Sequence, residues 1–317
     1  MSGRNVEAAG LPLLSIEDLS ISFNQYRGWF RQEKVQPIHG LHLQLRAGEV
    51  VAVVGSSGSG KSLLAHAILG ILPGNAEVRG SMRFDGRELS PELQAKLRGR
   101  QLALVPQSVN YLDPLMQVGK QVQAAVKGGD AVRKQREAFR RYGLAEQVDR
   151  LLPFQLSGGM ARRVLVSTAA VSGARVIIAD EPTPGLDEAS LDEALASLRE
   201  LADEGAAVML ITHDIASALR IADRVAVFYA GTTVEVAPAE DFAGDGGALR
   251  HPYSRALWRA LPQNGFAPAP GAQPQPGAMP AGCLYAPRCE LAAPPCAQAR
   301  PEPRELRGGM VRCFADA

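Results

Sequence analysis

The sequence of 317 residues has little cysteine, few aromatic residues and no long apolar run. All four cysteines follow residue 282, and aromatic residues make up 5% of the chain. No apolar stretch approaches the roughly 18 residues that span a bilayer, and the first residues lack the apolar core of a signal peptide. A net charge of +1 is unlike the basic balance of nucleic-acid-binding domains. We therefore expect a cytosolic protein that binds no nucleic acid and reaches any membrane only through a partner.

The residues that are present are typical of a globular protein with a sizeable core. Hydrophobic residues make up 46% and charged residues 21% of the chain, and its length suggests about two domains. We expect one unit over residues 13–262, with a helical subdomain at about 108–165. Residues 263–282 are rich in proline, glycine, alanine and glutamine, which predicts a stiff linker. The cysteines then fall in a short segment over 283–317.

One stretch fits the phosphate-binding pattern G-x-x-x-x-G-K-[ST] and lies between an expected strand and an expected helix. The apolar run over 49–54 predicts a buried parallel strand, and residues 63–72 predict a helix that stops at Pro73-Gly74. In such a loop the glycines let the backbone approach phosphates, the lysine reaches the β- and γ-phosphates, and the last serine can ligate Mg2+. The predicted nucleoside triphosphate site consists of Gly55, Ser56, Ser57, Gly58, Ser59, Gly60, Lys61 and Ser62.

A second apolar strand, expected over 176–179, delivers two acidic residues at its carboxyl end. An acid at this place in phosphate-loop enzymes holds Mg2+, and this role suits Asp180. Glu181 points the other way from the strand end and can polarise the attacking water, so it is our candidate general base. The alternation of strand, helix and strand over 175–211 indicates a parallel α/β sheet. A phosphate loop alone leaves kinases, GTPases, helicases and transporter motors open, and the acidic pair narrows the choice.

Further motifs follow these two in a characteristic order. They are Gln107 after an apolar strand, Leu156-Ser157-Gly158-Gly159 at a helix start, Pro184-Gly185-Leu186-Asp187, and Thr212-His213-Asp214 after another apolar strand. A serine and two glycines that open a helix form a second phosphate-binding element. The ordered set resembles the nucleotide-binding subunit of ABC (ATP-binding cassette) transporters, and the resemblance covers roughly residues 13–262.

This resemblance implies a fold and several roles. The fold would be an α/β P-loop NTPase: a RecA-like core with an antiparallel β subdomain and an α-helical subdomain, here followed by a small cysteine-containing extension. Gln107 would reach Mg2+ and the attacking water. His213 would contact the γ-phosphate and support Glu181. An aromatic ring near the end of the first strand would stack on adenine, and either Phe23 or Tyr26 could supply it.

The resemblance also implies a head-to-tail dimer. Ser157, Gly158 and Gly159 would clamp the γ-phosphate of ATP bound to the opposite subunit, and Asp187 would belong to the loop that passes between the two sites. Two positions depart from the family pattern. Met160 replaces the usual glutamine near the ribose, and a Pro-Gly pair before Leu186 replaces the usual Ser-Ala. The phosphate-binding serine and glycines remain, so we expect activity to be retained.

After the cassette, the chain carries His251-Pro252-Tyr253-Ser254-Arg255-Ala256-Leu257 and later Gly282-Cys283-Leu284-Tyr285-Ala286-Pro287-Arg288-Cys289. This pair of motifs resembles the tail of the dipeptide/oligopeptide/nickel importer branch, which implies uptake rather than export. The cysteine spacing is C-x5-C-x6-C-x16-C. Disulfides are disfavoured in the cytosol, and zinc prefers tighter cysteine pairs. Three alternatives stay open for Cys283, Cys289, Cys296 and Cys313: a [4Fe–4S] cluster, which some members of this branch carry, a zinc ion, or no metal.

Two functions from different classes remain. The favoured one is the ATP-hydrolysing, Mg2+-dependent motor of a membrane importer for peptides, nickel or metal–metallophore complexes. Its partners would be a second ATPase subunit, two membrane permease subunits and an external solute-binding protein, and it would lie on the cytoplasmic face of the membrane. The alternative is a soluble non-transport ABC ATPase. Soluble translation cassettes usually carry two nucleotide units and repair types carry a long coiled coil, whereas this chain has one unit and no such insertion.

Overall fold

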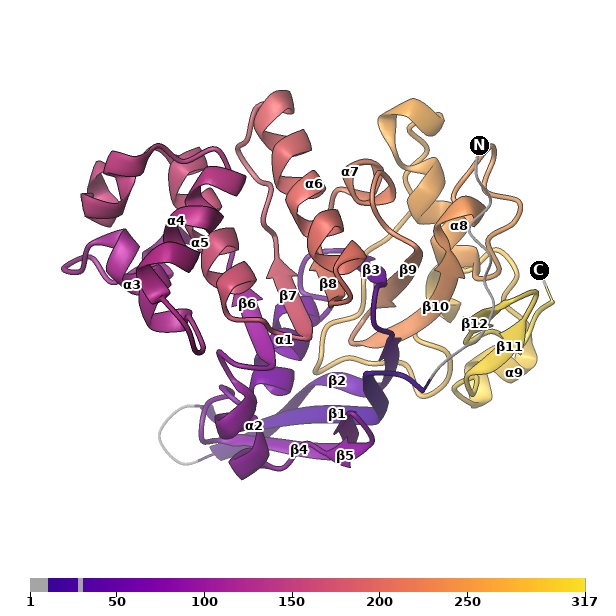
Figure 1. The fold of residues 1–317 in the computed structure, drawn as a ribbon. Coiled ribbons are helices and arrows are strands. Elements are labelled where there is room, and N and C mark those ends of the chain that lie inside the picture. The colour runs from indigo at the N-terminus through magenta and orange to yellow at the C-terminus, as the bar shows by residue number, and fades with distance from the viewer. Residues whose placement is uncertain (1–10, 28–30, 317) are drawn as a thin grey trace.

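The computed structural model describes residues 11–27 and 31–316, which form two β-sheets surrounded by helices (Figure 1). The larger sheet has the strand order β11-β12-β10-β9-β3-β8-β7-β6. Its strands are β3 (Val50–Gly55), β6 (Leu102–Val105), β7 (Val176–Asp180), β8 (Ala207–Ile211), β9 (Arg224–Tyr229), β10 (Thr232–Pro238), β11 (Arg304–Leu306) and β12 (Gly309–Val311). The strands from β9 to β6 in this order pair in parallel. Their continuous apolar sequences match this position, because helices or a second sheet cover both faces.

The smaller sheet is antiparallel, with the order β2-β1-β4-β5. Its strands are β1 (Leu14–Arg27), β2 (Arg31–Leu45), β4 (Ala76–Phe84) and β5 (Arg87–Glu88). Ile16 and Ile21 of β1 are buried while Glu17 is exposed, so one face packs on the core and the other meets solvent. The register shifts between Glu17 and Ser20, where Asp18 has a positive φ of 50°.

Nine α-helices lie in the part of the chain that the structure describes. They are α1 (Lys61–Leu69), α2 (Pro91–Leu97), α3 (Val118–Ala125), α4 (Ala131–Arg141), α5 (Gly158–Val171), α6 (Glu188–Asp203), α7 (Ile215–Leu219), α8 (Pro252–Arg259) and α9 (Pro294–Gln298). Helices α3, α4 and α5 pack together at one end of the molecule (Figure 1). None of the described helices combines the length and apolarity needed to cross a bilayer.

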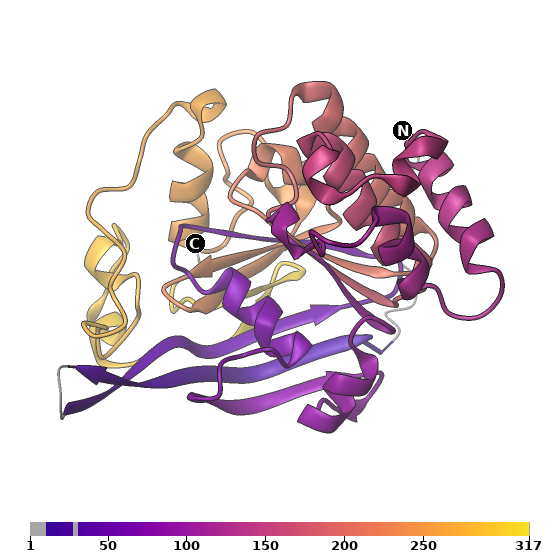
Figure 2. The same ribbon diagram turned by 90° about the vertical axis from the view of Figure 1, so that its left-hand side faces the viewer.

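The buried side chains form two cores, one on each face of the larger sheet. One core lies between this sheet and the antiparallel sheet, with α1 inside it, and includes Val51, Val53 and Ile68. The other core includes Val54 and Ile177, whose side chains lie on the opposite face, and the helices α3 to α6 cover it. In Figure 2 the antiparallel sheet lies below the larger sheet and the helices lie above it.

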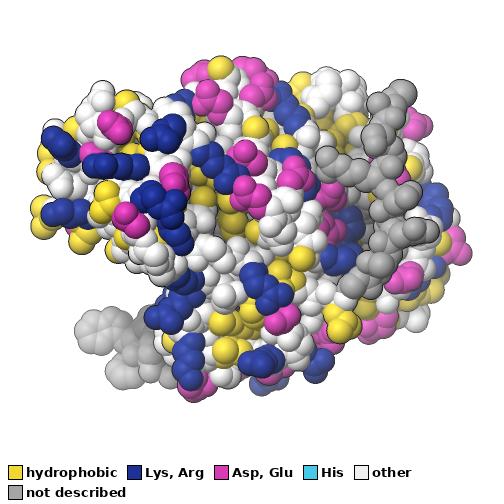
Figure 3. All heavy atoms as spheres, in the orientation of Figure 1, with side chains coloured by type: hydrophobic (Ala, Val, Ile, Leu, Met, Phe, Trp, Pro, Cys, Tyr) yellow, Lys and Arg dark blue, Asp and Glu magenta, His cyan; other side chains and the backbone are white. Residues whose placement is uncertain are grey.

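The segment over 283–317 packs directly on the cassette. Strand β12 pairs with β10 through Glu235↔Val311 and Val236↔Met310, so the larger sheet continues into this segment. Leu284 and Tyr285 belong to the helix-side core. The C-terminal segment lies beside α8 and β10 in both ribbon views (Figures 1 and 2). On the face shown in Figure 3, positive and negative side chains are interspersed, and the surface is hollowed between the helical region and the antiparallel sheet.

Candidate active site

The phosphate loop connects β3 to α1, as the sequence predicts. Gly55 has a φ of 153°, and a Cβ at this position would lie 2.3 Å from the carbonyl oxygen of Phe228 on β9, so only glycine fits. Gly60 has a φ of 96° and forms the N-cap of α1. The loop therefore turns sharply from the sheet edge into a helix N-terminus, whose N–H groups and dipole favour an anion.

Lys61 lies buried within this loop, with its side chain turned back over it. Its Nζ donates hydrogen bonds to the carbonyl oxygens of Gly55 at 2.9 Å and Ser56 at 3.1 Å. Burial lowers the pKa of Lys61, while the charges of Glu181 and Asp180 act to raise it. The two carboxylates thus favour the charged ammonium at the place where phosphates are expected.

Ser62 and Asp180 converge from different elements of the core. Ser62, in the first turn of α1, donates through Oγ to Oδ1 of Asp180 at the end of β7, at 3.1 Å. Burial raises the pKa of Asp180, and its hydrogen bond with Ser62 works against that rise. A hydroxyl and one carboxylate suit Mg2+, which takes oxygen ligands and completes its shell with substrate phosphates and water. The two residues thus fit the ion that the sequence predicts here.

Glu181 and His213 form the second pair at this sheet edge. Nδ1 of His213 lies 2.8 Å from one carboxylate oxygen of Glu181 and 3.0 Å from the other. The backbone N–H of Glu181 donates to the carbonyl oxygen of Ile211 at 2.8 Å. Glu181 has a φ of 48°, an uncommon value for a residue with a side chain, and such strain is concentrated at functional sites. The geometry holds a carboxylate beside the phosphate loop with an imidazole fixing its orientation.

Other predicted site residues lie apart from the phosphate loop in this single chain. Ser157 caps α5 by accepting a hydrogen bond from the backbone N–H of Met160 at 3.2 Å, and the two glycines of this helix start have no neighbour in the space where a Cβ would lie. Asp187 caps α6 through Ser190, and these hydrogen bonds lower its pKa. Gln107 is exposed just beyond β6. No hydrogen bond among the described residues joins any of these motifs to the loop.

Of the two aromatic candidates for adenine, only one can be described. Phe23 on β1 is half-buried and packs against the core between the two sheets. The side chain of Tyr26 lies outside the described residues. The choice between the two rings therefore stays a prediction.

The two departures from the family pattern are accommodated locally. Met160 is partly buried against the helix-side core. The loop after Glu181 is held by Arg162 of α5, which donates to the carbonyl oxygens of Pro182 and, at 2.6 Å, Pro184. Gly185 adopts a φ of 75°, which glycine tolerates without strain. The loop that carries Asp187 is thus anchored to the helix that carries the Ser-Gly-Gly motif.

One contact to the phosphate loop has no signal in the sequence. Oγ of Ser56 donates to Oε1 of Gln273 at 2.6 Å, although Gln273 lies in the proline-rich stretch expected to be a linker. Tyr253, in the motif after the cassette, also interacts with Ser56. Neither residue was a candidate site residue, because no local pattern of sequence shows which loop a linker will contact.

The four cysteines come together beside the core. All four are free, half-buried and line one cavity of about 200 Å³. Burial raises the pKa of the Cys283, Cys289 and Cys313 thiols, and neighbouring cysteines add to the rise. Within the described residues, no set of three or more His, Cys, Asp or Glu side chains is arranged to hold a metal ion. The expected iron–sulfur cluster and zinc ion therefore gain no support from this arrangement.

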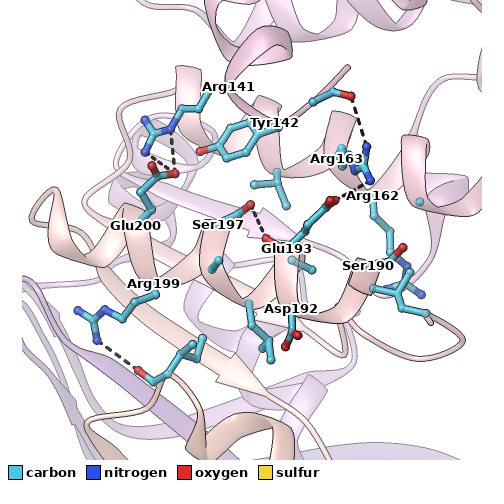
Figure 4. A pocket seen from close by; sticks show the side chains of 18 of the residues that line it. Arg141, Tyr142, Arg162, Arg163, Ser190, Asp192, Glu193, Ser197, Arg199 and Glu200 are labelled. Atoms are coloured by element: carbon cyan, nitrogen blue, oxygen red, sulfur yellow. Dashed lines mark hydrogen bonds and ion pairs between the residues drawn. The ribbon is translucent and has the colours of Figure 1, made fainter. Parts of the chain in front are cut away.

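A larger cavity, of about 740 Å³, lies between α6 and the helices α4 and α5 (Figure 4). Gly159 of the Ser-Gly-Gly motif and Leu186 of the following loop line one side of it. Ion pairs span it: Arg141 to Glu200 at 2.9 Å and Arg163 to Glu193 at 2.6 Å. None of its lining residues belongs to the phosphate loop or the catalytic pair, and the cavity flanks the two motifs that the resemblance assigns to the dimer interface.

A phosphate loop, an acidic strand end and a histidine bonded to the second acid together define an ATP-binding cassette. Comparison with known proteins agrees. The family described as "ABC transporter" matches residues 38–184, and the one described as "Oligopeptide/dipeptide transporter, C-terminal region" matches residues 234–296. The dimeric cassette MJ0796 is a structural neighbour, with a TM-score of 0.62 and 25% identity, and the match covers 71% of this chain and 98% of that one. The predicted P-loop NTPase fold is confirmed.

The relatives narrow the family further. The chain is 34% identical over 328 residues to the oligopeptide transport ATP-binding protein OppD of Escherichia coli, with coverage of 95% of this chain and 93% of the relative. It is 35% identical over 321 residues to the dipeptide transport ATP-binding protein DppD of the same organism, with coverage of 94% and 95%. Against OppD of Mycobacterium tuberculosis, 35% identical, it spans 50% of the relative's length. The chain belongs to the oligopeptide/dipeptide branch of ABC transporter ATP-binding proteins, as its motifs predict.

Proposed function

We propose that the chain is the ATP-hydrolysing motor subunit of a membrane importer that takes up peptides. The observation that carries this proposal is the Glu181–His213 pair, held at the sheet edge where Asp180 meets Ser62 of the phosphate loop. The relatives named above are described as transport proteins, which favours the motor over a soluble ATPase of the same fold. The chain would act at the cytoplasmic face of the membrane as a peripheral subunit.

The residues of the loop divide the work of binding and hydrolysis. Ser62 and Asp180 would hold Mg2+, which neutralises charge on the β- and γ-phosphates when bound. Lys61 would exchange its present carbonyl partners for phosphate oxygens. Glu181 would accept a proton from the attacking water while His213 keeps its carboxylate in place. Gln107, beyond β6, would orient that water once the helical region has moved toward the core.

A second ATPase subunit would complete the site. Ser157, Gly158 and Gly159 lie at a helix N-terminus whose two glycines leave room for a close approach of phosphate. They lie apart from the chain's own loop, which supports a role toward the loop of an opposite subunit. Asp187 would then lie at the junction of the two sites. The His213 side chain is 68% exposed in this chain, and closure of the dimer would enclose it together with Glu181.

The segment after Gln107 offers a surface for the membrane subunits. Tyr111 is 59% exposed, Leu115 90% and Met116 40%, whereas Leu112 is buried. Apolar side chains that are exposed together on one loop are typical of interaction sites. We assign this surface, Tyr111 with Leu115 and Met116, to a short segment of a permease subunit. The alternative for these side chains, packing inside the helical region, describes Leu112 alone.

The cargo follows from the relatives rather than from the chain's own site. The relatives reported above are named for oligopeptides and dipeptides, so we propose peptides, and nickel or a metallophore complex gains no support. An external solute-binding protein and the two permeases would select the peptide. For the cysteines we retain the [4Fe–4S] cluster as a proposal, because four thiols share one cavity and such a cluster binds four thiolates on separate iron atoms.

A pair of measurements tests the proposal. Lys61→Ala should weaken MgATP binding by more than tenfold in calorimetry, because the phosphates lose their buried cation, while Lys96→Ala on the exposed face of α2 should bind as the wild type does. Co-expression with the two permease genes should yield a complex whose ATPase activity rises with peptide-loaded binding protein. Normal ATP binding by Lys61→Ala would overturn the site, and purification as a free, fully active ATPase would favour the soluble alternative.

A further inference from the structure

Ser56, the second residue of the phosphate loop, is held by two residues that lie C-terminal to all the nucleotide-binding motifs. Its hydroxyl donates to Oε1 of Gln273 at 2.6 Å. The phenol of Tyr253 is the second partner. Burial raises the pKa of Tyr253, and hydrogen bonds with the hydroxyl and the backbone N–H of Ser56 work against that rise. A phenol that accepts the Ser56 N–H fixes the backbone of the loop as well as the side chain.

The position of Tyr253 is set by the residues that begin α8. The fully buried His251 caps this helix, and its Nδ1 accepts the backbone N–H of Tyr253 at 3.0 Å. The backbone N–H groups of Arg250 and His251 donate to the buried carboxylate of Glu235 on β10, at 2.8 and 2.9 Å. The first turn of α8 is thus tied to the sheet, and its tyrosine is directed at the phosphate loop.

Aromatic packing joins Tyr253 to the C-terminal segment. Its ring centroid lies 4.5 Å from that of Tyr229 and 5.3 Å from that of Tyr285. Arg288 donates to the hydroxyl of Tyr229 at 3.4 Å and to the carbonyl oxygen of Pro270 at 2.7 Å. The same arginine therefore anchors both the aromatic cluster and the proline-rich stretch that carries Gln273.

We infer that Tyr253 and Gln273 are positioning residues for the phosphate loop, and that through them the C-terminal segment sets the affinity of the site for MgATP. The inference rests on the proposed role of the loop. A loop held by its neighbours loses less conformational freedom when nucleotide binds, and that saving appears as affinity. The contacts bear on binding and not on proton transfer, so they act on KM and Kd rather than on kcat.

The test uses the full chain and three single variants. Tyr253→Phe keeps the ring and removes the hydroxyl, and Gln273→Ala removes the amide. Each should raise the Kd and KM for MgATP roughly 2- to 10-fold, the effect of one net hydrogen bond, with kcat within twofold of wild type. The matched control is Tyr285→Phe, which removes a phenol from the same cluster away from Ser56 and should leave Kd unchanged.

A merely structural role predicts a different result. It would lower Tm in Tyr253→Phe and leave the Kd of the folded fraction at the wild-type value, and this outcome would overturn the inference. Gln273→Ala provides an independent arm if Tyr253→Phe does not fold. Because Gln273 acts through the Ser56 hydroxyl, Gln273→Ala should add nothing to the effect of Ser56→Ala. If Lys61→Ala binds MgATP normally, the proposed function fails; if it alone loses binding, only this inference fails.

Discussion

Replacing Glu181 with glutamine separates chemistry from binding at this site. The backbone of Glu181 is held through its N–H by Ile211, and its side chain meets Nδ1 of His213 at 2.8 and 3.0 Å. Glutamine has the same shape and can keep one of these contacts, but its amide cannot take a proton from water. General-base catalysis contributes about 10²- to 10⁴-fold. Each tenfold corresponds to about 1.36 kcal/mol, so the barrier should rise by about 2.7–5.4 kcal/mol.

The assay is phosphate release in single- and multiple-turnover experiments at saturating MgATP, together with calorimetric binding. We expect hydrolysis to fall by at least about 10²-fold, MgATP affinity to be unchanged, and an ATP-bound dimer to accumulate in size-exclusion chromatography. Glu200→Gln, the same change on α6, should hydrolyse normally. Because Glu181 and His213 act as a unit, adding His213→Ala to Glu181→Gln should cost little more. Turnover of Glu181→Gln within threefold of the wild type would refute this reasoning.

Three further predictions concern other parts of the chain. Burial raises the folded-state pKa of Asp180 above its unfolded value, so ionisation costs stability once the pH exceeds both values; Asp180→Asn should therefore raise the Tm of the nucleotide-free protein at pH 7 while abolishing Mg2+-dependent hydrolysis, and an unchanged or lower Tm would contradict this. Leu115→Asp and Met116→Asp should abolish transport in vesicles yet spare basal ATPase activity, whereas loss of folding would place these side chains in a core. Protein purified without oxygen should absorb broadly near about 400 nm and contain about four iron atoms per chain, with Cys289→Ser bleached; colourless protein without iron would leave the thiols a structural role.

Local sequence was enough to predict the phosphate loop and the acidic strand end. Glycines, a lysine and a serine at fixed spacing specify a loop whose geometry depends on few distant contacts, and the apolar runs around it specify buried strands. The order of strands was not predictable in the same way. That Asp180 reaches Ser62 depends on β8 lying between β3 and β7, a long-range arrangement that no local pattern encodes.

The C-terminal part shows where such reasoning stops. A composition rich in proline and glycine predicted a linker over 263–282, and it contains no signal for the contact of Gln273 with Ser56. The cysteines were recognised as a group, and they do line one cavity, but their spacing alone could not distinguish a cluster, a zinc ion and free thiols. Strands β11 and β12, of three residues each, are too short to show a period-2 pattern.

The pairing of β12 with β10 has a consequence for how this protein can be shortened. A truncation after residue 282 would remove the outer neighbours of β10 and leave its N–H and C=O groups unpaired along an open edge, a template for intermolecular strand pairing. It would also uncover Glu235 and Arg250, a buried ion pair, because Arg250 donates to the carbonyl oxygen of Leu306. In the intact chain the outermost strand, β11, is only three residues long and carries Arg304, and such short, charged strands resist aggregation. The C-terminal segment thus protects the edge of the sheet, and removing it should produce insoluble protein rather than a minimal cassette.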